Sequence, residues 1–101
     1  MCFVFDIPTK TITDYTCLDI TDVSIPSSIA GVTVERIGEN AFKQKGLTSV
    51  SIPNTVKRIY SYAFRGNQLT SVSIPNSVTN LGDGAFSYNK LTSVTIPNSI
   101  T

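Results

Sequence analysis

Apolar and polar positions recur along this chain in short blocks with a fixed period. Three ten-residue stretches, LTSVSIPNTV, LTSVSIPNSV and LTSVTIPNSI, begin at Leu47, Leu69 and Leu91, each 22 residues after the last. Two further markers keep the same phase: Ala-Phe pairs at 41–42, 63–64 and 85–86, and Ile-Pro pairs at 52–53, 74–75 and 96–97, with an earlier Ile-Pro at 25–26. Three markers in one phase identify an internal repeat, and such a repeat decides the fold class before any other feature.

The first half of each unit predicts a short β-strand. In the stretch from Leu69, Val72 and Ile74 stand two residues apart and therefore point to one side, whereas Ser71 and Ser73 point to the other. Pro75 then ends the strand, because proline has no N–H to give to the ladder. We expect the valine and isoleucine to be core and the serines to be exposed.

The second half of the unit predicts a return path. It reads V-x-x-I/L and then Ala-Phe; in the middle unit these are Val56, Ile59, Ala63 and Phe64. We expect a short extended piece followed by one helical turn that carries the phenylalanine inward. Glycine and asparagine can take a left-handed backbone, and we expect the units to close through such residues, at Lys45-Gly46, Gly66-Asn67 and Tyr88-Asn89.

A strand and a return path of about 22 residues match the length of a leucine-rich repeat, whose successive strands lie parallel. The stretch LTSVSIPNSVTNLGDGAF resembles the BspA-like leucine-rich repeats, and the resemblance covers residues 18–101. It implies an α/β solenoid: a right-handed superhelix with a parallel β-sheet on the concave face and short extended or one-turn helical segments on the convex side. Tyr60 stands where the family tends to have glycine, which predicts a bulkier convex edge there.

The first 17 residues do not repeat. Phe3, Phe5 and Ile7 alternate on one side and TITDY follows a turn, so we expect a β-hairpin cap over residues 1–17. Residues 18–101 then form about three full units and a truncated last one in a single structural domain. We expect the chain to be a fragment of a longer protein, with Val94 and Ile96 at an open edge that favours end-to-end association between copies.

Charge is nearly balanced overall but is unevenly spread. The formal net charge of +1 argues against nucleic acid as a partner and gives no reason to invoke an anionic membrane. Residues 1–39 hold six acids and two bases, a net charge of −4, whereas residues 40–65 hold five bases and no acid, a net charge of +5. This pattern is typical of a solvated surface with a modest dipole, or of a basic patch that steers an acidic partner.

The residues needed for most catalytic chemistry are missing. The chain has no histidine, which excludes histidine-based triads and histidine-ligated metals, and it has no phosphate-binding glycine motif. Cys2 and Cys17 form one disulfide if the chain is secreted, or are two small buried thiols if it is not. We therefore expect neither an enzyme nor a cofactor nor a metal, and no apolar run approaches the ~20 residues of a membrane span.

Surface residues remain as candidates for binding a partner. One group is the outward face of the strands, and the other lies in the more individual segment KRIYSYAFRGN, because hot spots of interfaces favour tyrosine and arginine. The candidate residues are Ser49, Ser51, Ser71, Ser73, Ser93, Thr95, Arg58, Tyr60, Tyr62 and Arg65.

The resemblance implies a protein-recognition module of a cell-surface or secreted adhesin that binds host or other-cell proteins. The near-identity of the units leaves open an alternative, a structural spacer or self-assembling scaffold with no specific ligand. The sequence itself does not identify the partner protein.

Overall fold

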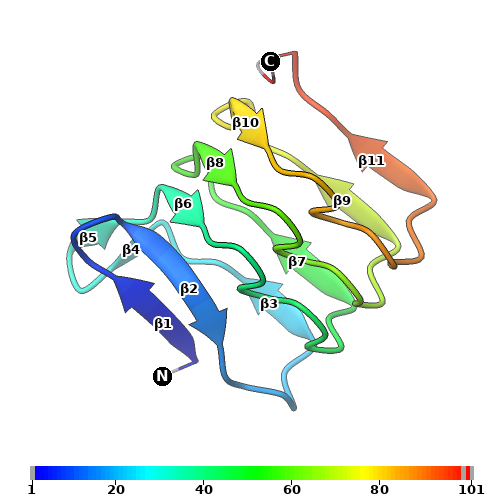
Figure 1. Cartoon of the computed structure of the whole chain (residues 1–101), viewed down its shortest axis with the longest axis horizontal. Coiled ribbons are helices and arrows are strands. Elements are labelled where there is room, and N and C mark those ends of the chain that lie inside the picture. Colours follow the sequence, from blue (N-terminus) through cyan, green and yellow to red (C-terminus); the bar gives the residue numbers. More distant parts are fainter. Residues whose placement is uncertain (1, 99, 101) are drawn as a thin grey trace.

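The chain forms a stack of coils with two rows of short strands, as Figure 1 shows for the computed structural model, which describes residues 2–98 and 100. One row consists of β6 (Arg36–Ile37), β8 (Arg58–Ile59) and β10 (Asn80–Leu81). The other consists of β3 (Asp22–Ser24), β7 (Ser49–Ser51), β9 (Ser71–Ser73) and β11 (Ser93–Thr95). The longer first unit adds a small hairpin of β4 (Ser28–Ile29) and β5 (Val32–Thr33).

The first row is extended by the N-terminal hairpin into a five-stranded sheet. Strands β1 (Phe3–Asp6) and β2 (Thr11–Tyr15) are antiparallel, and the sheet has the order β1-β2-β6-β8-β10. Strand β2 pairs parallel to β6, with Ile12 opposite Ile37. The hairpin therefore lies over the first coil by continuing its backbone ladder.

The second row has the predicted parallel register but is not one continuous sheet. Strand β3 pairs with β7 and β9 pairs with β11, so that Val23 stands opposite Val50 and Val72 opposite Val94. Strands β7 and β9 are neighbours (Figure 1) but share no ladder, so the single sheet predicted on this face is two separate pairs. The most continuous sheet lies on the opposite row, where only a short extended piece was expected.

The predicted helical turn at each Ala-Phe pair is wrong: the residues that the structure describes contain no helix, so the solenoid is built from strands and turns. Asn40, Tyr62 and Gly84 immediately precede the three Ala-Phe pairs and have φ of 62°, 60° and 62°, which interrupts a right-handed helical path. The phenylalanine N–H groups then donate to the next coil instead of to residue i−4: Phe42 to the Ala63 carbonyl and Phe64 to the Ala85 carbonyl, each at 2.7 Å.

Aromatic rings form a column through the core. Phe42 and Phe64 are fully buried, and ring centroids lie 5.0 Å apart between Phe42 and Phe64 and 5.1 Å apart between Phe64 and Phe86, with nearly parallel planes. Tyr15 and Phe3 of the hairpin continue the column onto Phe42. Each such pair is worth about 0.5–1.5 kcal/mol beyond the area it buries, so the column links the hairpin energetically to the repeats.

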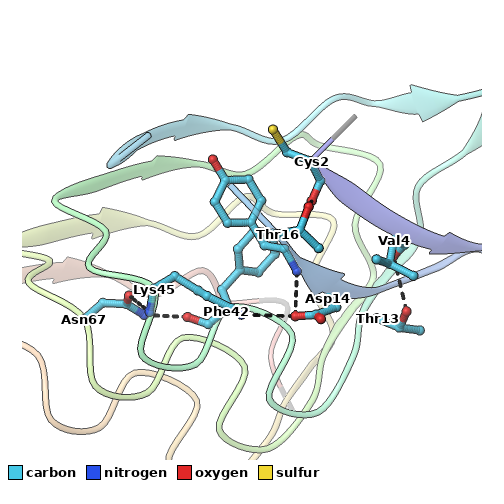
Figure 2. Close-up of polar contacts among 9 residues, drawn as sticks. Cys2, Val4, Thr13, Asp14, Thr16, Phe42, Lys45 and Asn67 are labelled. Carbon is cyan, nitrogen blue, oxygen red and sulfur yellow. Dashed lines mark hydrogen bonds and ion pairs between the residues drawn. The ribbon is translucent and has the colours of Figure 1, made fainter. Parts of the chain in front are cut away.

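A buried asparagine, Asn67, satisfies backbone groups where the middle unit closes. Asn67 is 2% exposed; its Oδ1 accepts the N–H groups of Lys45 and Leu47 at 3.0 Å, and its Nδ2 donates to the carbonyls of Phe42 and Phe64 at 2.8 Å. Figure 2 shows this side chain between Lys45 and Phe42. Asn67 was predicted only as a turn residue, whereas the structure gives it four hydrogen bonds that hold two coils together.

The first coil has lysine at the position of this asparagine. Asn89 repeats the pattern one coil further on, accepting from the Leu69 N–H at 3.1 Å and donating to the Phe86 carbonyl at 3.0 Å. Lys45, three residues after Phe42 as Asn67 is after Phe64, instead reaches Asp14 of the hairpin, with 3.3 Å between Nζ and Oδ1 (Figure 2). The substitution thus converts a contact between coils into a contact with the cap.

Gly82 allows two coils to approach closely. A Cβ added to Gly82 would lie 2.3 Å from the Ser61 nitrogen and 2.6 Å from the Tyr60 carbonyl carbon, both backbone atoms that cannot swing aside. Its N–H donates to the Ile59 carbonyl at 2.7 Å, which fixes that separation. Glycine is therefore required here by space and not by backbone conformation.

We predict that Gly82→Ala destabilises the fold by about 3 kcal/mol or more, because backbone must move to admit the methyl group. The matched control is Gly46→Ala: Gly46 has a φ of 73° but open space around the added Cβ, so only the cost of a left-handed alanine remains, about 1 kcal/mol. Urea unfolding measures both free energies. Equal losses in the two variants would show that steric contact at Gly82 is unimportant.

We predict that Asn67→Asp is more destabilising at neutral pH than Asn89→Asp. A carboxylate at position 67 would lose two donated hydrogen bonds and face the carbonyl oxygens of Phe42 and Phe64 while buried, a cost of about 3 kcal/mol or more. Asn89 is only half-buried, so water partly solvates the same change. Thermal unfolding at pH 7 compares the two; a larger loss at position 89 would contradict this account.

Candidate functional site

The predicted serine face lies where the sequence places it. Ser71 faces Ser93 and Ser73 faces Thr95 across β9 and β11, and all four are exposed. Ser51 is exposed beside Ser24, and the half-buried Ser49 donates its hydroxyl to the Asp22 carboxylate at 2.5 Å. The face offers short hydroxyl side chains on two strand pairs.

Two exposed tyrosines and an arginine form a compact surface group, which we call the Tyr-Arg-Tyr patch (Tyr62, Arg65 and Tyr88). The Arg65 guanidinium carbon lies 5.2 Å from the Tyr62 ring centroid and 4.7 Å from that of Tyr88, so the cation is placed against both rings. Tyr88 is 75% exposed and Tyr62 39%. Cation–π contacts of this kind are worth about 0.5–1 kcal/mol at an exposed site and restrict the rings before any partner arrives.

The turns at the Ala-Phe edge create this patch. Tyr62 and Tyr88 have φ of 60° and 56°, in the left-handed region, and both side chains are exposed. A Cβ on Gly84 would lie 2.7 Å from a Tyr62 ring carbon, so the Tyr62 ring lies over that glycine of the next coil. Coil stacking therefore places residues 26 positions apart on one surface.

A second arrangement lies on the outward face of the five-stranded sheet. Arg36 and Arg58 stand in register on β6 and β8, next to Thr11 of β2 and Asn80 of β10. A hollow of about 600 Å³ over these strands is lined by Pro8, Thr9, Thr11, Arg36, Arg58 and Tyr60. We call it the arginine hollow.

One carboxylate at the edge of this region is held by several cations. Glu35 lies 3.4 Å from the Lys10 ammonium and 3.8 Å from that of Lys57, and its side chain is 19% exposed. Burial acts to raise the pKa of Glu35, but the hydrogen bond from Lys10 and the charges of Lys10, Lys57 and Arg36 together outweigh it and lower that pKa. The carboxylate is therefore ionised and already paired.

Neither a metal-binding group of side chains nor a membrane-spanning helix is found among the residues that the structure describes. No group of three or more Cys, Asp or Glu side chains within residues 2–98 and 100 is placed to hold a metal ion. In the same part of the chain, no helix is long and apolar enough to cross a membrane.

Cys2 and Cys17 are joined in a disulfide, with Cα atoms 5.2 Å apart, which resolves the alternatives left open for this pair.

The structure divides the predicted candidate residues among three surfaces. The six strand residues lie on the β7 and β9–β11 face, Tyr62 and Arg65 lie in the Tyr-Arg-Tyr patch, and Arg58 and Tyr60 line the arginine hollow. The candidate list omitted Tyr88 and Arg36. Alignment of the repeats could have identified Arg36. The sequences ERI and KRI place Arg36 and Arg58 immediately before isoleucines at equivalent positions of two units.

The fold defines the class of protein: a solenoid of stacked leucine-rich-type coils with parallel strand pairing. The model of the BspA-type leucine-rich repeat region (6 copies) matches residues 10–101. The chain therefore belongs to the BspA-type leucine-rich repeat family, as the sequence resemblance predicted. A search of curated proteins found no match.

Two solved structures are similar to this chain. A leucine-rich repeat protein from Bacteroides ovatus ATCC 8483 is 29% identical with a TM-score of 0.56; the similarity covers 89% of this chain but only 30% of that one. The T. pallidum leucine-rich repeat protein TpLRR is 22% identical with a TM-score of 0.50, covering 94% of this chain and 68% of that one. Both similarities support the leucine-rich repeat solenoid, and the second concerns the fold alone.

We predict that Glu35 makes stability sensitive to acid. Its pKa is lowered in the folded state, so its contribution is present above the unfolded pKa and is lost as pH falls through the folded value. Glu35→Gln should therefore flatten the decline of unfolding free energy on acidification. The control is Glu39→Gln, an exposed acid with no ion pair among the described residues; an identical pH profile for both variants would contradict the assignment.

Proposed function

We propose that this chain is a non-enzymatic protein-recognition module and that it serves in a cell-surface or secreted adhesin binding host or other-cell proteins. Membership of the BspA-type family supports a protein-interaction role, since leucine-rich repeat proteins generally act as interaction scaffolds. The disulfide between Cys2 and Cys17 supports an oxidising compartment, where such bonds persist. The similarity covers only 30% of the Bacteroides ovatus protein. The role of this chain within a whole adhesin is therefore proposed here and does not follow from that similarity.

The single observation that carries this proposal is the Tyr-Arg-Tyr patch. Tyrosine and arginine are enriched among interface hot spots, and tyrosine buries a large area at low entropic cost. Arg65 lies against the rings of both Tyr62 and Tyr88, so less side-chain freedom is lost on binding. The three side chains are exposed or half-exposed, and no fold requirement explains a 75% exposed tyrosine at position 88.

The serine face plays a smaller part in this proposal. Its side chains are short, and standard interfaces need about 800 Å² per partner, more than four short strands supply. In the proposed complex these strands form the polar rim, including Ser71, Ser73, Ser93 and Thr95. The patch supplies the aromatic and cationic anchors.

The alternative function is a structural spacer that presents other parts of a longer protein. The regular column of phenylalanines and the repeated hydrogen-bonded asparagines, Asn67 and Asn89, favour it, because they show how readily identical coils stack. The two functions differ in one measurable way. A spacer has no partner whose binding depends on the patch, whereas a recognition module does.

The test is binding of the whole chain to an array of extracellular and cell-surface proteins, followed by variants on every positive partner. Tyr88→Ala and Arg65→Ala should each weaken binding at least about tenfold, as loss of a hot spot does. The matched control is Lys90→Ala, an exposed residue next to the same edge with no ion pair among the described residues. Circular dichroism confirms that each variant is folded.

Two results would overturn the proposal. The first is the absence of any partner on an array that a longer bacterial leucine-rich repeat protein does bind, which would favour the spacer. The second is a partner whose affinity is unchanged by Tyr88→Ala and Arg65→Ala, which would move the binding surface elsewhere.

A further inference from the structure

The outward face of β6 and β8 places two like charges side by side. Arg36 and Arg58 are in-register partners of a parallel pair, and such neighbours lie ~4.8 Å apart across the strands. Ile37 and Ile59 point into the core, so both arginines point outward. Like charges directly opposite one another destabilise a sheet, and this arrangement therefore has a cost that the fold alone does not explain.

Among the described residues, no acidic side chain forms an ion pair with Arg36 or Arg58. Glu35 is the nearest candidate, but its two oxygens are bound by Lys10 and Lys57. Arg36 donates one guanidinium N–H to the Thr9 carbonyl at 2.5 Å. The Arg58 side chain has no hydrogen-bond or ion-pair partner within residues 2–98 and 100, so its guanidinium is available to an external acceptor.

Tyr60 divides the surface beside these arginines into two hollows. Its equivalents in the neighbouring coils are Gly38 and Gly82, so the Tyr60 side chain stands between two positions without side chains. On one side is the arginine hollow. On the other is a smaller hollow of about 280 Å³, which is lined by Arg58, Ile59, Tyr60, Ser61, Asn80, Leu81 and Gly82.

We propose that this face binds an extended polypeptide segment that carries an acidic side chain. The carboxylate lies between the guanidinium groups of Arg36 and Arg58, where charge-assisted hydrogen bonds form and the like-charge repulsion is relieved. The side chain two residues further along the segment enters the smaller hollow, beyond the Tyr60 ring. This inference rests on the proposed function in one respect, that the ligand is a polypeptide. None of the proposed contacts involves the Tyr-Arg-Tyr patch.

The spacing of the two hollows matches an extended peptide. The arginine hollow is centred near β6 and the smaller one lies between β8 and β10, about one and a half strand spacings away, or ~7 Å. Side chains i and i+2 of an extended chain are also ~7 Å apart. Position 82 is a glycine without a side chain, and the volume of about 280 Å³ admits an aliphatic side chain such as valine.

The test is an NMR titration of the folded chain with the blocked peptide acetyl-Gly-Glu-Gly-Val-Gly-amide. Backbone amides of Thr11, Arg36, Arg58, Tyr60 and Gly82 should shift together and saturate at millimolar peptide. A twin peptide with Gln in place of Glu supplies the control for charge. Arg58→Gln should weaken binding about threefold to tenfold, and Lys90→Gln, an equal loss of charge at another edge, should leave it unchanged.

Several outcomes would overturn the inference: equal binding of the Gln peptide, equal weakening by Lys90→Gln, or shifts confined to other surfaces. Glucuronate or inorganic phosphate shifting these amides while the Glu peptide does not would assign the face to a sugar acid or a phosphate instead. Tyr60→Gly, which restores the small residue of the neighbouring coils, should weaken the Glu peptide without loss of the fold. Tyr88→Ala should have no effect here, so failure of this inference is distinguishable from failure of the patch.

Discussion

Backbone hydrogen bonding between adjacent coils is the constraint on which the other features depend. The N–H groups of Tyr60 and Gly82 donate to the carbonyls of Ile37 and Ile59, one coil earlier, at 2.9 and 2.7 Å. Each position is thereby held one strand spacing from its equivalent, so identical side chains must either pack on themselves or repel. Phenylalanine and asparagine tolerate this repetition because rings stack and an amide is both donor and acceptor, whereas arginine does not.

The same constraint explains why surfaces that look unrelated in sequence are continuous in space. Arg36 and Arg58 meet on the five-stranded sheet, and Tyr62 and Tyr88 enclose Arg65 at the turn edge. In both cases the contact arises because the coil places residues about one repeat apart next to each other. Departures from the repeat, such as Tyr60 between two glycines, are then the positions where a surface acquires a shape of its own.

The hairpin shows how a repeating stack accepts a different neighbour. Strand β2 offers the first coil a parallel ladder, and Tyr15 offers Phe42 an aromatic ring, so the non-repeating segment reproduces both interactions that a further coil would supply. Lys45 completes the join by contacting Asp14 where later coils have asparagine. The cap is therefore integrated through backbone, core and charge together.

The sequence by itself determined the repeat, its inward-facing valines and isoleucines, its family and the exposed strand serines. These features depend on a two-residue alternation within each strand and on a 22-residue repeat between units, and both can be read directly along the chain. It did not determine the absence of helical turns, which depends on left-handed residues such as Asn40 and Tyr62 and on hydrogen bonds to the next coil. Nor did it reveal that Asn67 is buried or that one strand row divides into pairs. Tertiary structure decided these features, since each depends on the distance between coils and on which carbonyls remain without a partner.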